Sequence, residues 1–158
     1  FLLDLAEDLP MADMLIIGRV WEPELAERAG TLANVYIVGH VPPSDVPICL
    51  DAATVLLMPS TERLPYAEFM SPLKVPEYMA AGRAIVASSL PSVRELLTLL
   101  VAPEDKEHWL RAIRRVLDYP QLRADLGSAA QADVEDLSWD KRAERIVAWL
   151  ADTSLPTS

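Results

Sequence analysis

Cysteine is almost absent from this 158-residue chain, and Cys49 is its only one. No disulfide can therefore form within the chain, and we interpret the thiol as a small buried apolar group on a helix. Cations are also scarce, since 14 Lys and Arg face 24 Asp and Glu, for a formal net charge of −10. Without a basic run or patch, nucleic acid is not expected as a partner.

Long hydrophobic runs are missing too. The longest, 52–58 and 96–102, fall far short of the roughly 20 residues that cross a bilayer. The first residues carry Asp4 and Glu7 in a helical pattern and do not resemble a leader peptide. We expect no integral membrane segment and a cytoplasmic location. Any peripheral contact with a membrane would be made by another domain of the same protein.

Short apolar runs alternate with helical patterns over the first two thirds of the chain. The sequence predicts strands at 14–17, 35–38, 54–58, 84–87 and 99–101. It predicts helices at 1–6, 23–29, 45–52 and 72–81, and a short one opened by a capping box of Ser92 and Glu95. Apolar strands alternating with helices predict an α/β fold, a Rossmann-like doubly wound parallel sheet covered on both faces. Ligands of such sheets bind at the carboxyl ends of the strands.

The last third of the chain is predicted to be helical. Helices are expected at 107–118 and 120–132, and Ser138 is expected to cap a final one. We expect one domain over residues 1–150, with these C-terminal helices, and a polar tail over 151–158. The tryptophans are interpreted as core or interdomain packing residues: Trp109, Trp139 and Trp149.

One junction lacks the residues that a reversal of the chain needs. Between Leu96 and Leu100 a helix must end and a strand must begin, yet no Gly, Pro, Asn or Asp is present. We expect that a loop near Thr98 has been deleted or is missing.

The segment from Ser71 to Gly82 carries the richest chemistry. Ser71 suits an N-cap and Pro72 the first helical position, so free amides of the first turn could hold a diphosphate. Lys74 is unfavourable so near a helix N-terminus unless an anion binds there. Glu77 could accept hydrogen bonds from a ribose diol. The alternative is a capped helix whose Lys74 and Glu77 face water, which the spacing alone favours.

An ordered set of motifs resembles glycosyltransferase family 4, which has the GT-B fold. The segments that carry the resemblance are 34–41, 52–60, 71–74, 77–82, 84–88 and Ser138-Trp139. The resemblance runs from about Met14 to Leu150. It implies the C-terminal half of a GT-B enzyme, the domain that binds the nucleotide-sugar donor.

The resemblance also implies roles for particular residues. Glu77 would hold the ribose hydroxyls, Leu73 would pack near the ribose, and Val41 would lie against the base. The complete set of implied donor-binding residues is Val41, Ser60, Ser71, Pro72, Leu73, Lys74 and Glu77. The donor would be a UDP- or GDP-sugar, and its sugar would pass to an unknown acceptor with retention, without a metal or another cofactor.

Two residues depart from the family pattern. A second glutamate that contacts the sugar is replaced by Phe69, and Glu68 and Glu62 are weak substitutes, so no catalytic residue is assigned beyond Glu68. Pro76 falls in the first turns of the expected helix, where we expect a tight or irregular start. His40 and His108 have no partner at metal-ligand spacing, so no metal site is expected.

The resemblance places further parts before Phe1: a first strand with basic phosphate-binding residues, and an N-terminal acceptor domain. Without them we expect this chain alone to be inactive. Two alternatives stay open: a non-catalytic binding or scaffold domain of the same fold, and a sugar-nucleotide epimerase.

Overall fold

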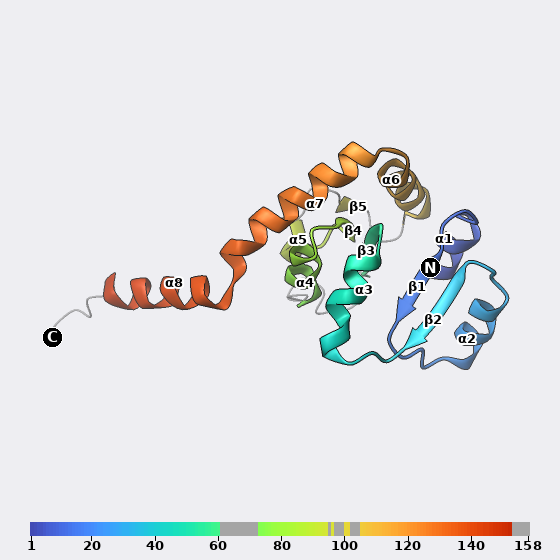
Figure 1. The fold of residues 1–158 in the computed structure, drawn as a ribbon, viewed down its shortest axis with the longest axis horizontal. Helices are drawn as coiled ribbons and strands as arrows, with labels where there is room; N and C mark the ends of the chain where they lie inside the picture. The colour runs from blue at the N-terminus through green and yellow to red at the C-terminus, as the bar shows by residue number, and fades with distance from the viewer. Residues whose placement is uncertain (61–72, 95, 97–99, 102–104, 153–158) are drawn as a thin grey trace.

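The computed structural model of the protein describes residues 1–60, 73–94, 96, 100–101 and 105–152 (Figure 1). Predictions that concern Glu62, Glu68, Phe69, Ser71 and Pro72 lie outside the described residues, as does the proposed gap at residue 98.

The first third of the chain forms a parallel pair of strands with two helices. Its elements are α1 (Leu2–Glu7), β1 (Met14–Ile17), α2 (Pro23–Gly30) and β2 (Val35–Gly39). Leu15 lies opposite Tyr36 in the β1–β2 register. Both strands run into glycines with positive φ, +129° at Gly18 and +78° at Gly39, and the Gly18 N–H donates to the Gly39 carbonyl at 2.7 Å. The two glycines thus end the strand pair in a backbone conformation that residues with a Cβ rarely adopt.

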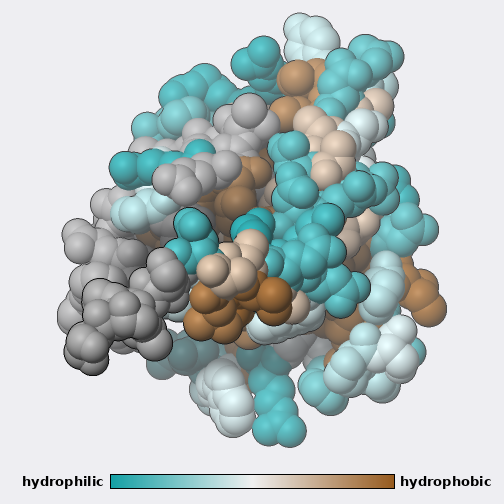
Figure 2. Space-filling view, turned by 90° about the vertical axis from the view of Figure 1, so that its left-hand side faces the viewer, coloured by the Kyte–Doolittle hydropathy of each residue, from teal (hydrophilic) through white to brown (hydrophobic). Residues whose placement is uncertain are grey.

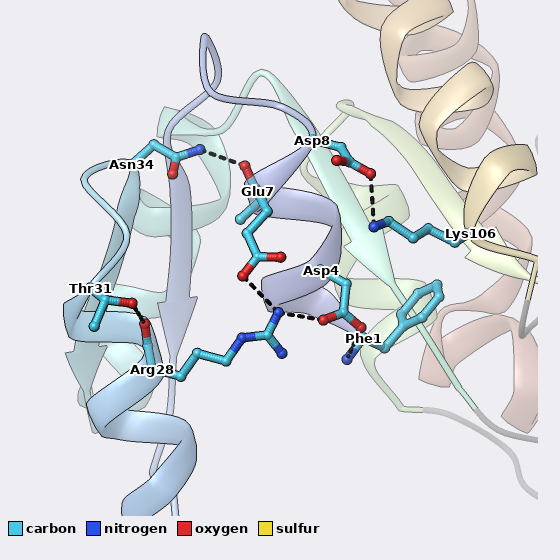
Figure 3. Close-up of polar contacts among 9 residues, drawn as sticks. Phe1, Asp4, Glu7, Asp8, Arg28, Thr31, Asn34 and Lys106 are labelled. Carbon is cyan, nitrogen blue, oxygen red and sulfur yellow. Dashed lines mark hydrogen bonds and ion pairs between the residues drawn. The ribbon is translucent and has the colours of Figure 1, made fainter.

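Helix α1 is held to its neighbours by polar contacts (Figure 3). Arg28 of α2 donates to the carboxylates of Asp4 and Glu7, at 2.8 Å for Glu7, and the hydrogen bond lowers the pKa of Asp4. Lys106 pairs with Asp8 at 2.7 Å. The Asn34 side-chain amide donates to three carbonyls at the end of α1 and in the following loop, those of Ala6, Leu9 and Ala12. The amide thus ties the end of α1 and the following loop to the segment that leads into β2.

The middle of the chain builds a second parallel ladder. Its elements are η1 (Pro43–Asp45), α3 (Val46–Ala52), β3 (Val55–Met58), α4 (Lys74–Ala80), β4 (Ala84–Ser88), α5 (Pro91–Arg94) and β5 (Leu100–Val101). Strand β4 lies between β3 and β5, with Val55 opposite Ala84 and Met58 opposite Ala87. All five residues of β4 are buried, as a central parallel strand requires.

Within the described residues the strands form two ladders, β1–β2 and β3–β4–β5. In the common doubly wound order 3-2-1-4-5-6, such ladders flank the position of strand 1. That this strand precedes the chain stays a prediction.

Side chains of β4 alternate between two apolar cores. Val86 belongs to one core with Trp109 and helix α6, and Ile85 belongs to the other with Met79 and helix α4. Successive side chains of a strand point to opposite faces, so both faces of this ladder are covered. This double covering is the arrangement that the alternating sequence pattern predicted.

The C-terminal helices are α6 (Lys106–Asp118), α7 (Pro120–Val134), η3 (Glu135–Leu137) and α8 (Trp139–Asp152). The Ser138 hydroxyl accepts from the Lys141 N–H at 3.3 Å, which confirms the predicted cap of the last helix. Figure 1 shows α8 extending away from the rest of the molecule. Among the described residues, no helix has both the length and the apolar character that a bilayer crossing needs.

The tryptophans separate into two environments. Trp109 is fully buried, and its ring meets that of Phe1 edge-on, with centroids 5.7 Å apart. Trp139 and Trp149 of α8 are 79% and 66% exposed, so of the two alternatives, core or interdomain packing, the core of this domain does not apply to them. Figure 2, seen from the side of α8, shows hydrophobic surface among hydrophilic side chains. Packing of these two residues against another domain stays a prediction.

Helix α7 lies directly on the turn between α4 and β4. Gly82 ends α4 with φ +62°, and a Cβ at Gly127 would lie 2.2 Å from the Gly82 carbonyl oxygen. Only glycine at position 127 permits this backbone contact. The Gln131 amide donates to the Ala80 carbonyl nearby, at 3.3 Å.

Replacing Gly127 with Ala is expected to lower the free energy of unfolding by about 1–3 kcal/mol, because the added methyl group overlaps the Gly82 carbonyl. Urea unfolding measures the change. Gly30→Ala is the matched control: Gly30 ends α2 with nothing within 4 Å of a Cβ, so the stability should stay within about 1 kcal/mol. An unchanged midpoint for Gly127→Ala would contradict the contact.

Candidate functional site

The carboxyl ends of β3 and β4 lie side by side, because the two strands are parallel and in register up to Met58 and Ala87. Just beyond them, the buried Ser88 hydroxyl accepts from the Ser60 N–H at 2.8 Å and donates to the Ser60 carbonyl at 3.0 Å. Pro59 has no N–H to donate at this point. Both backbone groups of Ser60 are thus paired, and its side chain is partly exposed.

Helix α4 begins at Lys74, with Leu73 at the N-cap position, two residues later than the sequence predicted. The reason is Pro76. A helix starting at residue 72 would bring the proline ring against the carbonyl four residues earlier. With the observed start, Pro76 is the third helical residue, where an N–H would have no partner within the helix. The expected irregular start therefore takes the form of a shorter helix.

Helix α4 buries one side and exposes the other. Val75 and Met79 are buried in the core, whereas Lys74 and Glu77 are exposed and lie one turn apart. Within the part of the chain that the structure describes, neither exposed side chain has an ion pair with another side chain. Their exposure fits both interpretations of this helix, a ligand-binding face and a face that only contacts water.

The remaining predicted site residues stand at different places. Leu73 is 78% exposed just before α4, and Val41 is partly buried after β2, on the other ladder. His40, beside Val41, is exposed. Among the described residues, no group of three His, Cys, Asp or Glu side chains could hold a metal ion. That the reaction needs no metal stays a prediction.

Ser88 is the residue whose part in this site the sequence analysis missed. A serine directly after a buried apolar strand was visible, but its pairing with Ser60 depends on the register of β3 against β4. Proline at position 59 was the available signal, since it leaves a gap in the ladder that a neighbouring side chain can fill.

Residues 2–119 match the family model of Glycosyl transferases group 1. The chain belongs to this family. It is 30% identical over 144 residues to a phosphatidyl-myo-inositol mannosyltransferase of Mycolicibacterium smegmatis. This alignment covers 87% of this chain and 36% of that protein.

Solved structures of glycosyltransferases share the fold. HepE of Anabaena, solved in complex with UDP and glucose, superposes with a TM-score of 0.73 at 20% identity, over 94% of this chain and 44% of that one. Sucrose-phosphate synthase of Thermosynechococcus elongatus gives 0.75 at 24% identity, over 97% and 42%. These comparisons confirm the recognition of a GT-B C-terminal domain and its Rossmann-like fold. The chain spans less than half the length of these proteins.

Tyr78, beside Glu77, predicts a dependence of stability on alkaline pH. Burial raises the pKa of Tyr78 above its ordinary value of 10.0, and the charge of Glu77 adds to the effect. The unfolded chain therefore loses this proton first, and the free energy of unfolding falls as the pH rises from about 10 towards the folded pKa. Urea unfolding from about pH 8 to about pH 11 should show a smaller fall for Tyr78→Phe.

Tyr119→Phe is the control for this series, because Tyr119 is exposed. It should keep the full alkaline fall of the wild-type protein. Equal slopes for Tyr78→Phe and the wild type would show that the Tyr78 phenol is not desolvated.

Proposed function

We propose that this chain is the donor-binding part of a glycosyltransferase. The enzyme takes a UDP- or GDP-sugar and passes the sugar to an acceptor with retention, without a metal or another cofactor. The observation that carries the proposal is the family match over residues 2–119. A nucleotide-sugar donor is further supported by HepE, whose fold this chain shares and which was also solved with UDP-glucose.

Glu77 is the residue on which donor binding depends in this proposal. Its exposed carboxylate has no ion-pair partner among the described residues, so it can accept two hydrogen bonds from the ribose hydroxyls. Hydrogen bonds to a charged acceptor are stronger than neutral ones, which makes them suitable for anchoring the nucleotide. Lys74, on the same face of α4, would supply positive charge near the diphosphate.

The other predicted residues complete the donor site. Val41 would contact the base and Leu73 would contact the ribose. The Ser60 hydroxyl would line the same donor cleft. Ser71 and Pro72 would contribute backbone groups beside the diphosphate. Stabilising the leaving diphosphate with such donors lowers the barrier to transfer. The acceptor side belongs to an N-terminal domain in this proposal, so this chain alone would bind a donor without turning it over.

Calorimetric titration of the full-length protein with UDP, GDP and ADP tests the proposal. One nucleotide should bind saturably without divalent metal. Glu77→Gln should weaken it by about tenfold or more, because charged hydrogen bonds contribute about 1.5–3 kcal/mol. Glu107→Gln is the matched control, since Glu107 is exposed on α6 and should leave the affinity unchanged.

The titration also separates the proposal from its rival. If the folded full-length protein binds none of the three nucleotides, the transferase proposal fails and a scaffold domain of the same fold is favoured. Binding that Glu77→Gln leaves intact would remove Glu77 from the site while keeping the donor class.

A further inference from the structure

Ser88 stands out by its burial. It is the single polar or charged residue with a buried side chain in the part of the chain that the structure describes, and none of its surface is exposed. Ala87 before it and Leu90 two residues after it are apolar and equally buried. Burying a hydroxyl is unfavourable unless its hydrogen bonds are made. An alanine would fill most of the same space without that requirement.

Both hydrogen bonds of the Ser88 hydroxyl go to one residue. It accepts from the Ser60 N–H and donates to the Ser60 carbonyl, so its donor is used and the backbone of Ser60 is held at two points. Ladder pairing between β3 and β4 ends at Met58 and Ala87, and Pro59 offers no donor. The Ser88 side chain therefore links the end of β4 to Ser60, two residues beyond the last paired residue of β3.

Ser88 itself is fixed by its own backbone. It is the last residue of β4, it pairs with Val101 of β5, and its carbonyl accepts from the Leu90 N–H at 2.8 Å. Beyond it, the Arg94 side chain donates to the Ser89 hydroxyl at 3.0 Å and closes the turn into α5. A hydroxyl on so well-anchored a backbone is a fixed partner for Ser60.

We propose that Ser88 is a positioning residue for the donor site: its buried hydroxyl fixes the backbone of Ser60 and so the direction in which the chain leaves β3. This inference rests on the proposed function, in which the Ser60 side chain lines the donor cleft. Ligands in parallel sheets bind at the carboxyl ends of the strands, where Ser60 lies. A small displacement of a group that contacts a ligand can lower the affinity strongly, because the contact depends on precise positioning.

The backbone and the side chain of Ser60 then have different roles. Its N–H is held by Ser88, so it does not bind phosphate, and the Ser60 side chain is the part that serves the donor. A purely structural Ser88 would stabilise the fold without affecting donor affinity in the folded state. The two roles therefore differ in a measurable way.

The test uses the full-length protein with Ser88→Ala, Ser88→Thr and the control Ser128→Ala, an exposed serine of α7. Nucleotide affinity is measured well below each unfolding midpoint, and amide hydrogen exchange is followed at Ser60. We expect Ser88→Ala to weaken the bound nucleotide by roughly tenfold or more and to remove the protection of the Ser60 amide. Ser88→Thr, which keeps the hydroxyl, should restore both.

Each other outcome overturns the inference. Wild-type affinity in folded Ser88→Ala, with only a lower unfolding midpoint, would make Ser88 structural. Protection of the Ser60 amide that is retained in Ser88→Ala would show that another group accepts its hydrogen bond. This outcome is decisive even if Ser88→Thr does not fold. If Glu77→Gln weakens binding and Ser88→Ala does not, this inference fails and the proposed function stands. If the wild-type protein binds no nucleotide, both fail.

Discussion

Strand β4 is buried on both faces, and the rest of the described structure depends on this constraint. Val86 needs a helical layer on one side and Ile85 needs another on the opposite side, which α6 and α4 supply. Helix α7 then packs across the junction of α4 and β4, where only Gly127 permits contact with the Gly82 backbone. The position of α4, and of Glu77 on it, thus follows from how a central apolar strand must be covered.

The same strand also determines where polar chemistry can begin. Its side chains are apolar up to Ala87. The first polar one, Ser88, is still buried, and both hydrogen bonds of its hydroxyl are made with Ser60. Beyond this pair the sheet ends, and Ser60 is partly exposed. Under our inference, Ser88 affects a ligand without touching it, because it fixes the backbone that carries the Ser60 side chain.

Much of this could be predicted from the sequence, and the failures have physical causes. The bounds of β1 were predicted fully, since an apolar run closed by Gly18 has few alternatives. Helix α5 begins at Pro91, so Ser92 lies inside it and does not cap it, because proline suits a first helical position better than the capping-box pattern suggested. Helical periodicity predicted α8, but periodicity does not say what the apolar side chains of a helix contact, and Trp139 is exposed. Pairings across strands, such as Ser88 with Ser60, depend on register and are invisible to local patterns.

Electrostatics explains why the donor site that we propose would depend on local groups. The chain carries a net charge of −10, which repels a nucleoside diphosphate at long range. At physiological ionic strength, however, charges further apart than about 8 Å are largely screened. The distant acidic residues therefore matter little once the ligand is bound, and the nearest donors decide the affinity. On the described part of α4, Lys74 is the one cation, while Glu77 is suited to the uncharged ribose hydroxyls and would repel the phosphates. In the proposed site, a nucleotide would therefore lie with its ribose towards Glu77 and its diphosphate towards Lys74.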